Sequence, residues 1–305
     1  MFVYVNGDLV AEEHATISVL DHSFLYGDGV FEGISVDRGR IFRLDAHLAR
    51  LLRSAERLRI SSFLSFEQLK EAVVQVVATN GLRDGYVRPI LSRGTGPIGI
   101  GYTREIKRPN IVIIPQVRPR LSDEQRLVHG LAAKVLDIRR TPPQCLDPSV
   151  KSNNYLNQIL GKWEQWDAGV DIGIMLDVDG AISECCGENI FLVKGEVLRT
   201  PPAHNILNGI TRQAIMELWR REDHEVSEEP LTAADLLAAD EVFVTATLIE
   251  VAAITVIDGR TIGTGEGGPI TRRLLKLLRE EMFSTGLPVD YDGVRTGPAG
   301  ATADG

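Results

Sequence analysis

A single lysine, Lys151, lies where the sequence could support Schiff-base chemistry. It is placed between a proline-stiffened loop and a segment whose apolar residues have helical spacing, and Cys145, Leu146 and Val150 surround it with little competing charge. Removing an ammonium group from water lowers its pKa and frees the neutral amine to act as a nucleophile. Lys151 is therefore a candidate for covalent bonding to a carbonyl compound.

Tyr155 follows four residues later and is the first candidate partner of this lysine. If a helix begins at about Ser152, the phenol faces back towards the loop that carries Lys151, where it could hydrogen-bond a ring oxygen. The same two residues also fit a solvated loop lysine and a core aromatic side chain. Other segments of the chain have to decide between these interpretations.

Further along the chain, several groups suit an anionic aromatic ligand. Glu184 lies at the end of a predicted strand, and Thr245 and Thr247 end another. A tight turn precedes an apolar helical pattern, so the backbone N–H groups of Ile210 and Thr211 are expected at a helix N-terminus, which favours a phosphate. With the lysine, these parts meet the needs of pyridoxal phosphate: an amine for its aldehyde, a carboxylate for its ring nitrogen and donors for its phosphate.

The elements that must position these groups form two predicted domains. Residues 1–118 are expected to be a small α+β domain that opens with a hairpin, and residues 119–130 a polar, proline-bearing interdomain loop. Residues 131–290 are expected to form a larger domain of hairpins and helices. The last residues, 291–305, have too few apolar side chains to pack and are predicted to be disordered.

Local patterns define the small domain more closely. Asp45 is expected to cap its first helix, and Ser65 with Gln68 to form a capping box at the start of its second. Tyr86 and Arg88 are two residues apart in a predicted strand, so their side chains share one face. An arginine on that face needs a reason.

Composition limits the classes of function. A chain of 305 residues with 44% hydrophobic residues can bury sizeable cores, and a net charge of -9 without a basic block argues against nucleic acid or an anionic membrane surface as partner. No apolar run approaches the roughly 20 residues that a membrane span requires, and the N-terminus has no basic segment or cleavage site, so we expect a cytoplasmic protein. The three cysteines offer neither a disulfide framework nor a zinc spacing, so no metal is expected.

Six motifs, in consistent order over roughly residues 1–290, resemble the class IV aminotransferases of fold type IV. The similarity is greatest to the branched-chain amino acid aminotransferases. This resemblance implies a small N-terminal α+β domain and a larger C-terminal domain with the active site between them. The motifs are YGDGVFEG, YVRP, the lysine loop followed by NNYLNQIL, ISECCGENIF, ILNGITR and VTAT.

The resemblance also implies a role for each matching residue. Lys151 would hold pyridoxal 5'-phosphate and move the Cα proton, Tyr155 would donate to the ring oxygen, and Glu184 would keep the pyridine nitrogen protonated. The residues implied for the phosphate are Arg50, Ile210, Thr211 and Thr247. Those implied for the substrate pocket, some of them from the partner subunit of a dimer, are Tyr26, Phe31, Tyr86, Arg88 and Leu248.

The implied reaction moves an amino group between a branched-chain L-amino acid and 2-oxoglutarate in a homodimer or higher homo-oligomer. One pocket must then accept both an apolar side chain and a carboxylate, and Arg88, masked by tyrosines, could serve both. The alternatives are D-amino acid transamination, (R)-amine transamination, aminodeoxychorismate lyase activity and, outside catalysis, a binding protein. The Tyr86 and Arg88 pair favours the branched-chain group.

Several positions depart from the family pattern. Cys185 and Cys186 replace the usual small residues after the pyridine-binding acid, Ser35 replaces a common basic residue, and Asn208 stands where proline or an acid is common. Leu248 lies in TATLIE, where the family pattern is TGTAAE. These departures bear on the identity of the substrate and not on the identity of the cofactor.

Overall fold

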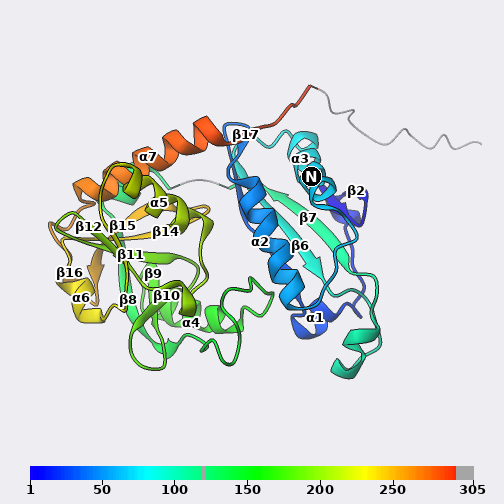
Figure 1. The fold of residues 1–305 in the computed structure, drawn as a ribbon, viewed down its shortest axis with the longest axis horizontal. Helices are drawn as coiled ribbons and strands as arrows, with labels where there is room; N and C mark the ends of the chain where they lie inside the picture. Colours follow the sequence, from blue (N-terminus) through cyan, green and yellow to red (C-terminus); the bar gives the residue numbers. More distant parts are fainter. Residues whose placement is uncertain (119–120, 293–305) are drawn as a thin grey trace, which may run out of the picture.

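The computed structural model describes residues 1–118 and 121–292, which form two lobes that are each built around one β-sheet (Figure 1). The first lobe, coloured blue to cyan, holds the N-terminal residues, and the second, coloured green to orange, holds most of the remainder. Helix α7 (Pro269–Thr285) runs along the top of the second lobe towards the first. The expected α+β architecture in two parts is confirmed.

The first sheet is antiparallel throughout, with the strand order β17-β5-β4-β6-β7-β1-β2 and β3 paired with β6. Asn6 and Gly7 form the expected turn between its first two strands, and their φ angles of 54° and 122° are the positive values that a two-residue hairpin loop needs. The strands are β1 (Phe2–Val5), β2 (Asp8–Ala11), β3 (Gly29–Phe31), β4 (Ile34–Asp37), β5 (Arg40–Ile41), β6 (Gly85–Ser92), β7 (Asn110–Gln116) and β17 (Leu287–Pro288).

Two long helices cover the first sheet. The predicted capping box of Ser65 and Gln68 is present at the start of α3. The predicted cap at Asp45 is wrong, because α2 begins at Leu44 and its N-cap is Arg43, two residues before Asp45. The Asp45 carboxylate pairs instead with Lys70 at 2.8 Å. The helical segments of this lobe are η1 (Glu12–His14), α1 (His22–Tyr26), α2 (Leu44–Arg57), α3 (Phe66–Thr79) and η2 (Ile100–Glu105).

The second sheet is mixed, with the order β10-β9-β8-β15-β14-β11-β12-β13 and β16 beside β15. Three of its pairs are parallel: β8 with β9, β8 with β15, and β12 with β13. Its strands are β8 (Leu131–Arg139), β9 (Ile172–Leu176), β10 (Ile182–Cys185), β11 (Asn189–Lys194), β12 (Val197–Thr200), β13 (Val226–Glu228), β14 (Glu241–Ala246), β15 (Glu250–Ile257) and β16 (Arg260–Thr261). The helical segments after residue 120 are η3 (Glu124–Val128), α4 (Leu156–Asp167), η4 (Ala203–Asn205), α5 (Ile210–Arg221), α6 (Ala233–Leu237) and α7.

The helix expected from about Ser152 begins four residues later, at Leu156. The intervening residues are not helical because they pair with β3 of the first lobe. Phe31 N donates to the Lys151 carbonyl at 3.0 Å, and Ser152 forms an isolated bridge with Val30. The loop that carries the lysine is therefore attached to the opposite lobe.

The boundary expected at residue 290 does not match the structure, because the chain returns to the first lobe before that residue. Strand β17 pairs with β5 of the first sheet, and Val289 is buried in the core of that lobe. The Tyr291 hydroxyl donates to the Leu82 carbonyl at 2.8 Å. Residues 287–291 thus pack with the first lobe, although 131–290 was expected to be one domain and Tyr291 was placed in the tail.

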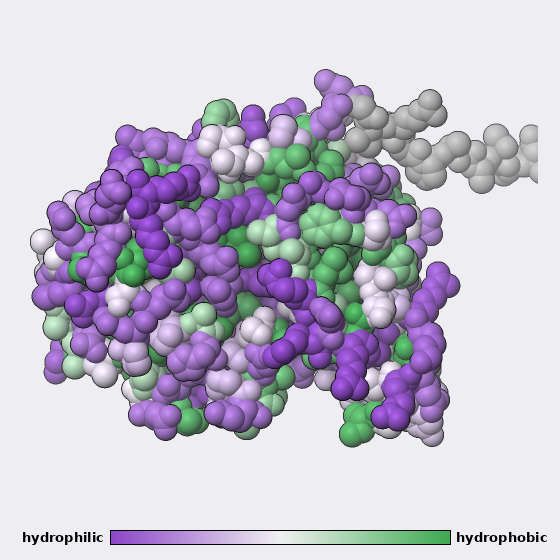
Figure 2. Space-filling model, viewed as in Figure 1, coloured by the Kyte–Doolittle hydropathy of each residue, from purple (hydrophilic) through white to green (hydrophobic). Residues whose placement is uncertain are grey.

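The predicted interdomain loop contains a short π-helix, Glu124–Val128, which its polar composition did not indicate. The predicted disorder from residue 293 onwards lies outside the described residues. Hydrophilic residues cover most of the face seen in Figure 2, and the hydrophobic patches are most visible over the first lobe. Within 1–118 and 121–292, no helix combines the length and the apolar character needed to cross a bilayer.

The core of the second lobe gives a test of the fold. Phe191 and Phe243 stack with ring centroids 5.1 Å apart, and neither side chain is exposed. Phe243→Ala should lower the free energy of unfolding by about 3–5 kcal/mol, because it leaves a cavity beside its partner ring. Phe63→Ala, at a side chain that is 43% exposed, should cost less than about 1 kcal/mol. Urea unfolding followed by circular dichroism measures both, and equal losses would contradict this description of the core.

Candidate active site

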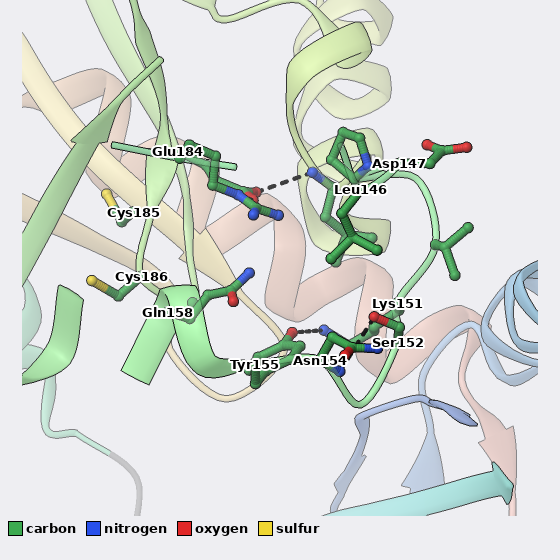
Figure 3. Close-up of a pocket in the computed structure, with 15 residues that line it drawn as sticks. Leu146, Asp147, Lys151, Ser152, Asn154, Tyr155, Gln158, Glu184, Cys185 and Cys186 are labelled. Atoms are coloured by element: carbon green, nitrogen blue, oxygen red, sulfur yellow. Dashed lines mark hydrogen bonds and ion pairs between the residues drawn. The ribbon is translucent and has the colours of Figure 1, made fainter. Parts of the chain in front are cut away.

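Lys151 and Tyr155 meet at the boundary between the lobes (Figure 3). Lys151 Nζ donates to Tyr155 Oη at 2.9 Å and lies 4.7 Å from the centroid of the Phe31 ring. The Phe31 and Tyr155 rings are in edge-to-face contact, with centroids 5.1 Å apart. The structure therefore brings the predicted lysine and phenol together, with Tyr155 at the N-cap of α4 rather than inside a helix.

Glu184 lies on β10 and points towards the same region (Figure 3). Its Oε1 accepts a hydrogen bond from Arg140 Nε at 2.9 Å, and its Oε2 accepts one from Leu207 N at 3.1 Å. Burial raises the pKa of Glu184 above its ordinary value, while the charge and hydrogen bond of Arg140 oppose that rise. Sequence reasoning missed Arg140, and the one local hint was a pair of arginines at the end of a strand.

The N-terminus of α5 provides unpaired backbone donors. Its N-cap is Gly209, which has no side chain to bond the N–H groups of Ile210 and Thr211. A Cβ at this position would collide with Asn189 Oδ1, so a larger residue would require the Asn189 side chain to move. The sequence prediction of a helix start at Ile210 is confirmed.

Two threonines extend this donor set. Thr245 is buried, and in the part of the chain that the structure describes its hydroxyl has no hydrogen-bond partner. Thr247 Oγ1 donates to the Gly33 carbonyl at 3.0 Å and so links the two lobes. Both threonines line the same cavity as Ile210 and Thr211.

Arg50 reaches the same region from α2, but much of its hydrogen-bonding capacity is already used. Its Nε and Nη2 donate to the Glu32 carboxylate at 2.6 and 2.9 Å, and its Nη1 donates to the Asn208 carbonyl at 2.8 Å. A guanidinium has five N–H donors, so two of those on Arg50 are left for a ligand. The Asn208 contact places these donors beside the N-terminus of α5.

Glu32, which sequence reasoning missed, is fully buried between Arg50 and His47. His47 Nδ1 lies 2.8 Å from Glu32 Oε2. Burial would raise the pKa of Glu32, but the charge and hydrogen bonds of Arg50, with the contact to His47, outweigh it and hold the pKa at about 2. The available hint was an acid between apolar residues in a motif that otherwise reads as a buried strand.

The opposite wall of the cavity comes from the first sheet. Tyr86 and Arg88 lie on β6, and Arg88 Nε donates to Tyr86 Oη at 3.2 Å. The Arg88 guanidinium lies over the Phe31 ring, 4.5 Å from its centroid. Gly33 makes room for this arrangement, since a Cβ there would stand 2.5 Å from Tyr86 Oη. Leu248 faces the wall from the turn between β14 and β15.

Tyr26 is the predicted site residue that the structure does not place at this cavity. It ends α1, and its hydroxyl accepts a hydrogen bond from Gly99 N at 2.7 Å. Within one chain, the described residues that line the cavity do not include it. Its predicted role would require a second subunit.

The remaining predicted groups, apart from Glu184, open onto one cavity of about 490 Å³. Phe31, Arg50 and Arg88 reach it from the first lobe, and Lys151 and Tyr155 from the second. Glu184 lines an adjoining hollow that shares Lys151 and Tyr155. Small-molecule sites commonly have volumes of about 300–1,000 Å³, so the space suits a cofactor with a bound substrate.

Comparisons with known proteins agree with this geometry. Residues 29–257 match the family described as amino-transferase class IV. A putative branched-chain-amino-acid aminotransferase of Methanocaldococcus jannaschii is 42% identical over 293 residues, which cover 96% of this chain and 100% of the relative. The branched-chain-amino-acid aminotransferase of Pseudomonas aeruginosa is 34% identical over 279 residues, or 90% of each chain.

Solved structures extend the comparison to three dimensions. A crystal structure of a branched-chain amino acid aminotransferase with pyridoxamine 5'-phosphate has a TM-score of 0.88 and 33% identity, and the match covers 92% of this chain and 93% of that one. The enzyme from Thermoproteus uzoniensis with norvaline has a TM-score of 0.85 and 35% identity, over 92% and 94% of the two chains. The fold, the arrangement of the site and these similarities together show that the chain belongs to the class IV aminotransferases.

Proposed function

We propose that this aminotransferase moves an amino group between a branched-chain L-amino acid and 2-oxoglutarate, with pyridoxal 5'-phosphate bound between the lobes. The observation that carries the proposal is the convergence of Lys151, Glu184 and the α5 N-terminus on connected space, opposite a wall that is both aromatic and cationic. The names of the similar proteins support the branched-chain substrate.

The cavity residues fit this cofactor. The buried Thr245 hydroxyl, which has no partner among the residues that the structure describes, calls for a ligand. The uncapped N–H groups of Ile210 and Thr211 suit a phosphate, as do the two remaining donors of Arg50. The buried Glu184 carboxylate suits a protonated ring nitrogen. When bound, pyridoxal phosphate supplies an electron sink for the negative charge that forms at the substrate Cα.

Lys151 has the position and the chemistry to act as both the cofactor anchor and the base. Phe31 and Tyr155 flank its Nζ, with ring centroids 4.7 and 5.5 Å away, and hold the amine facing the cavity. In this proposal Lys151 takes the proton from the substrate Cα, and Tyr155 orients the ring by donating to its oxygen. Thr247 lines the same cavity, but its single hydroxyl proton is donated to the Gly33 carbonyl, so the hydroxyl would have to turn away from Gly33 to donate to the phosphate.

The substrate side combines apolar and charged groups. Phe31, Tyr86 and Leu248 offer surface for a branched side chain, and Arg88 offers a guanidinium for a distal carboxylate. Because Arg88 rests on the Phe31 ring and on Tyr86 Oη, its charge has local partners while an apolar side chain is bound. One pocket can thus serve both substrates.

We further propose a homodimer in which Tyr26 lines the cavity of the partner subunit. Around Tyr26, the side chains of Phe24, Ile98 and Ile100 are 69%, 69% and 77% exposed, and a second copy would cover them. The cytoplasm is the compartment we propose, because all three cysteines are free thiols.

The substrate class can be tested with half-reactions followed by cofactor absorbance. We expect L-leucine to convert the cofactor to its amino form at a rate at least about tenfold higher than D-alanine or (R)-1-phenylethylamine. The reason is that the transition state is stabilised by binding only when the side chain and the carboxylate of the donor both fit the pocket. Regeneration by 2-oxoglutarate should complete the cycle. A preference for either of the other two donors would replace the branched-chain assignment.

Lys151→Ala should abolish multiple turnover, because no other ammonium group in the described cavity lies beside Tyr155 Oη. Borohydride reduction followed by peptide mass mapping should place the phosphopyridoxyl group on Lys151 in the unmodified protein and find none in the variant. Lys276→Ala, at a side chain that is 66% exposed on α7, serves as the control. Wild-type turnover in Lys151→Ala would refute the assigned base.

Arg88→Ala should impair glutamate selectively. A charge-assisted hydrogen bond contributes roughly 1.5–3 kcal/mol, so kcat/KM for glutamate should fall by about 10- to 200-fold. Leucine should change much less, because it has no distal carboxylate. Steady-state kinetics with both donors measure the difference, and equal losses would instead assign Arg88 to the α-carboxylate or to the structure.

A further inference from the structure

Several charged groups that line the cavity are paired with a group of opposite charge. Arg50 is bound to Glu32, and Lys162 Nζ lies 3.7 Å from Glu188 Oε1. One pair thus lies in each lobe, and neither adds net charge to the lining of the cavity. Net positive charge facing a substrate therefore comes from residues of the lining that are not in ion pairs.

Two guanidinium groups in the cavity lining have no carboxylate partner among the residues that the structure describes. Within 1–118 and 121–292, neither Arg88 nor Arg118 forms an ion pair, although both line the cavity. Arg118 Nε donates to Gln116 Oε1 at 2.9 Å, which leaves the four N–H groups on its two Nη atoms for a ligand. Each arginine thus donates its Nε–H to a neutral neighbour, and the N–H groups on its two Nη atoms remain for a ligand.

The strand register places both arginines on one face of the first sheet. Tyr86 pairs with Gln116 and Arg88 with Ile114, and directly paired residues of antiparallel strands point to the same side. Arg118 follows Gln116 by two residues, and its hydrogen bond to that side chain keeps it on this side. Arg118 and Arg88 therefore flank Tyr86 along one wall.

Two such cations on one wall distinguish substrates by the number of their carboxylates. A branched-chain amino acid has one carboxylate, whereas glutamate and 2-oxoglutarate have two. The binding free energy of a dicarboxylate becomes more favourable with each additional cation near its second carboxylate. A second arginine can therefore hold that carboxylate where Arg88 alone does not reach it.

We propose that Arg118 is a second specificity-determining residue, which with Arg88 selects dicarboxylic substrates at the entrance to the cavity. This inference rests on the proposed transamination and deepens it, because it assigns the dicarboxylate preference to two residues rather than to one. Arg118 is exposed, so its interaction with a carboxylate is screened by solvent and by salt. Its contribution should weaken as ionic strength rises, as should that of Arg88, which is also exposed.

Arg118→Gln tests the proposal because it removes the charge and keeps polar atoms near Gln116. We expect kcat/KM for glutamate to fall by about 2- to 5-fold and that for leucine to stay nearly unchanged, with the glutamate effect shrinking at high salt. Arg118→Lys should restore part of the loss. Arg53→Gln, at an exposed arginine of α2, is the matched control and should leave both donors unchanged.

Binding of two unreactive acids gives a readout that needs no turnover. The dissociation constants of glutarate and 4-methylpentanoate, measured by calorimetry on the holoenzyme, should show a selective weakening of glutarate in Arg118→Gln. Equal weakening of both acids, or no change in either, would overturn the role of Arg118. Failure of the unmodified protein to transaminate leucine would instead contradict the proposed function, and the difference in glutarate binding would still test Arg118.

Discussion

The backbone pairing between β3 and residues 151–153 is the constraint on which the site depends. Phe31 N bonds the Lys151 carbonyl, and Asn153 N bonds the Gly29 carbonyl at 2.8 Å. The lysine belongs to the second lobe by sequence, but its backbone is held by the first. The position of its amine is therefore a property of the interface between the lobes, and a shift of one lobe would move Lys151 relative to Glu184.

Two further contacts hold the same interface around the proposed phosphate site. Arg50 joins Glu32 of the first lobe to the Asn208 carbonyl of the second, and Thr247 joins the Gly33 carbonyl. The Glu32 and Arg50 charges are buried together, and such a pair is costly to break from one side because the remaining charge has no water to solvate it. This arrangement orders the anion site before a ligand arrives, which reduces the entropy lost on binding.

The sequence was most informative where a local pattern fixes the outcome. The Asn6–Gly7 turn, the Ser65 capping box and the helix start at Ile210 each follow from a few neighbouring residues, and each is present in the structure. Lys151 and Tyr155 are only four residues apart, so their contact could be expected even though the helix start beside them was placed too early.

The partners that sequence reasoning missed are distant along the chain. Arg140 contacts Glu184 across 44 positions, and Glu32 contacts Arg50 across 18, so no local periodicity links them. The helix cap at Asp45 failed for a related reason. Arg43 takes the N-cap in a left-handed conformation, where its guanidinium reaches Glu217 of the second lobe at 2.6 Å. Contacts between the lobes thus override local preferences at these positions.

Strand β17 has a consequence for how the chain acquires its fold. It closes the edge of the first sheet at β5, yet it is made of residues 287–288, after the whole second lobe. While the ribosome synthesises the chain from its N-terminus, β5 stays an open edge with unpaired backbone groups until this last strand emerges. The edge of the first sheet at β5 is consequently completed only after the second lobe has been synthesised.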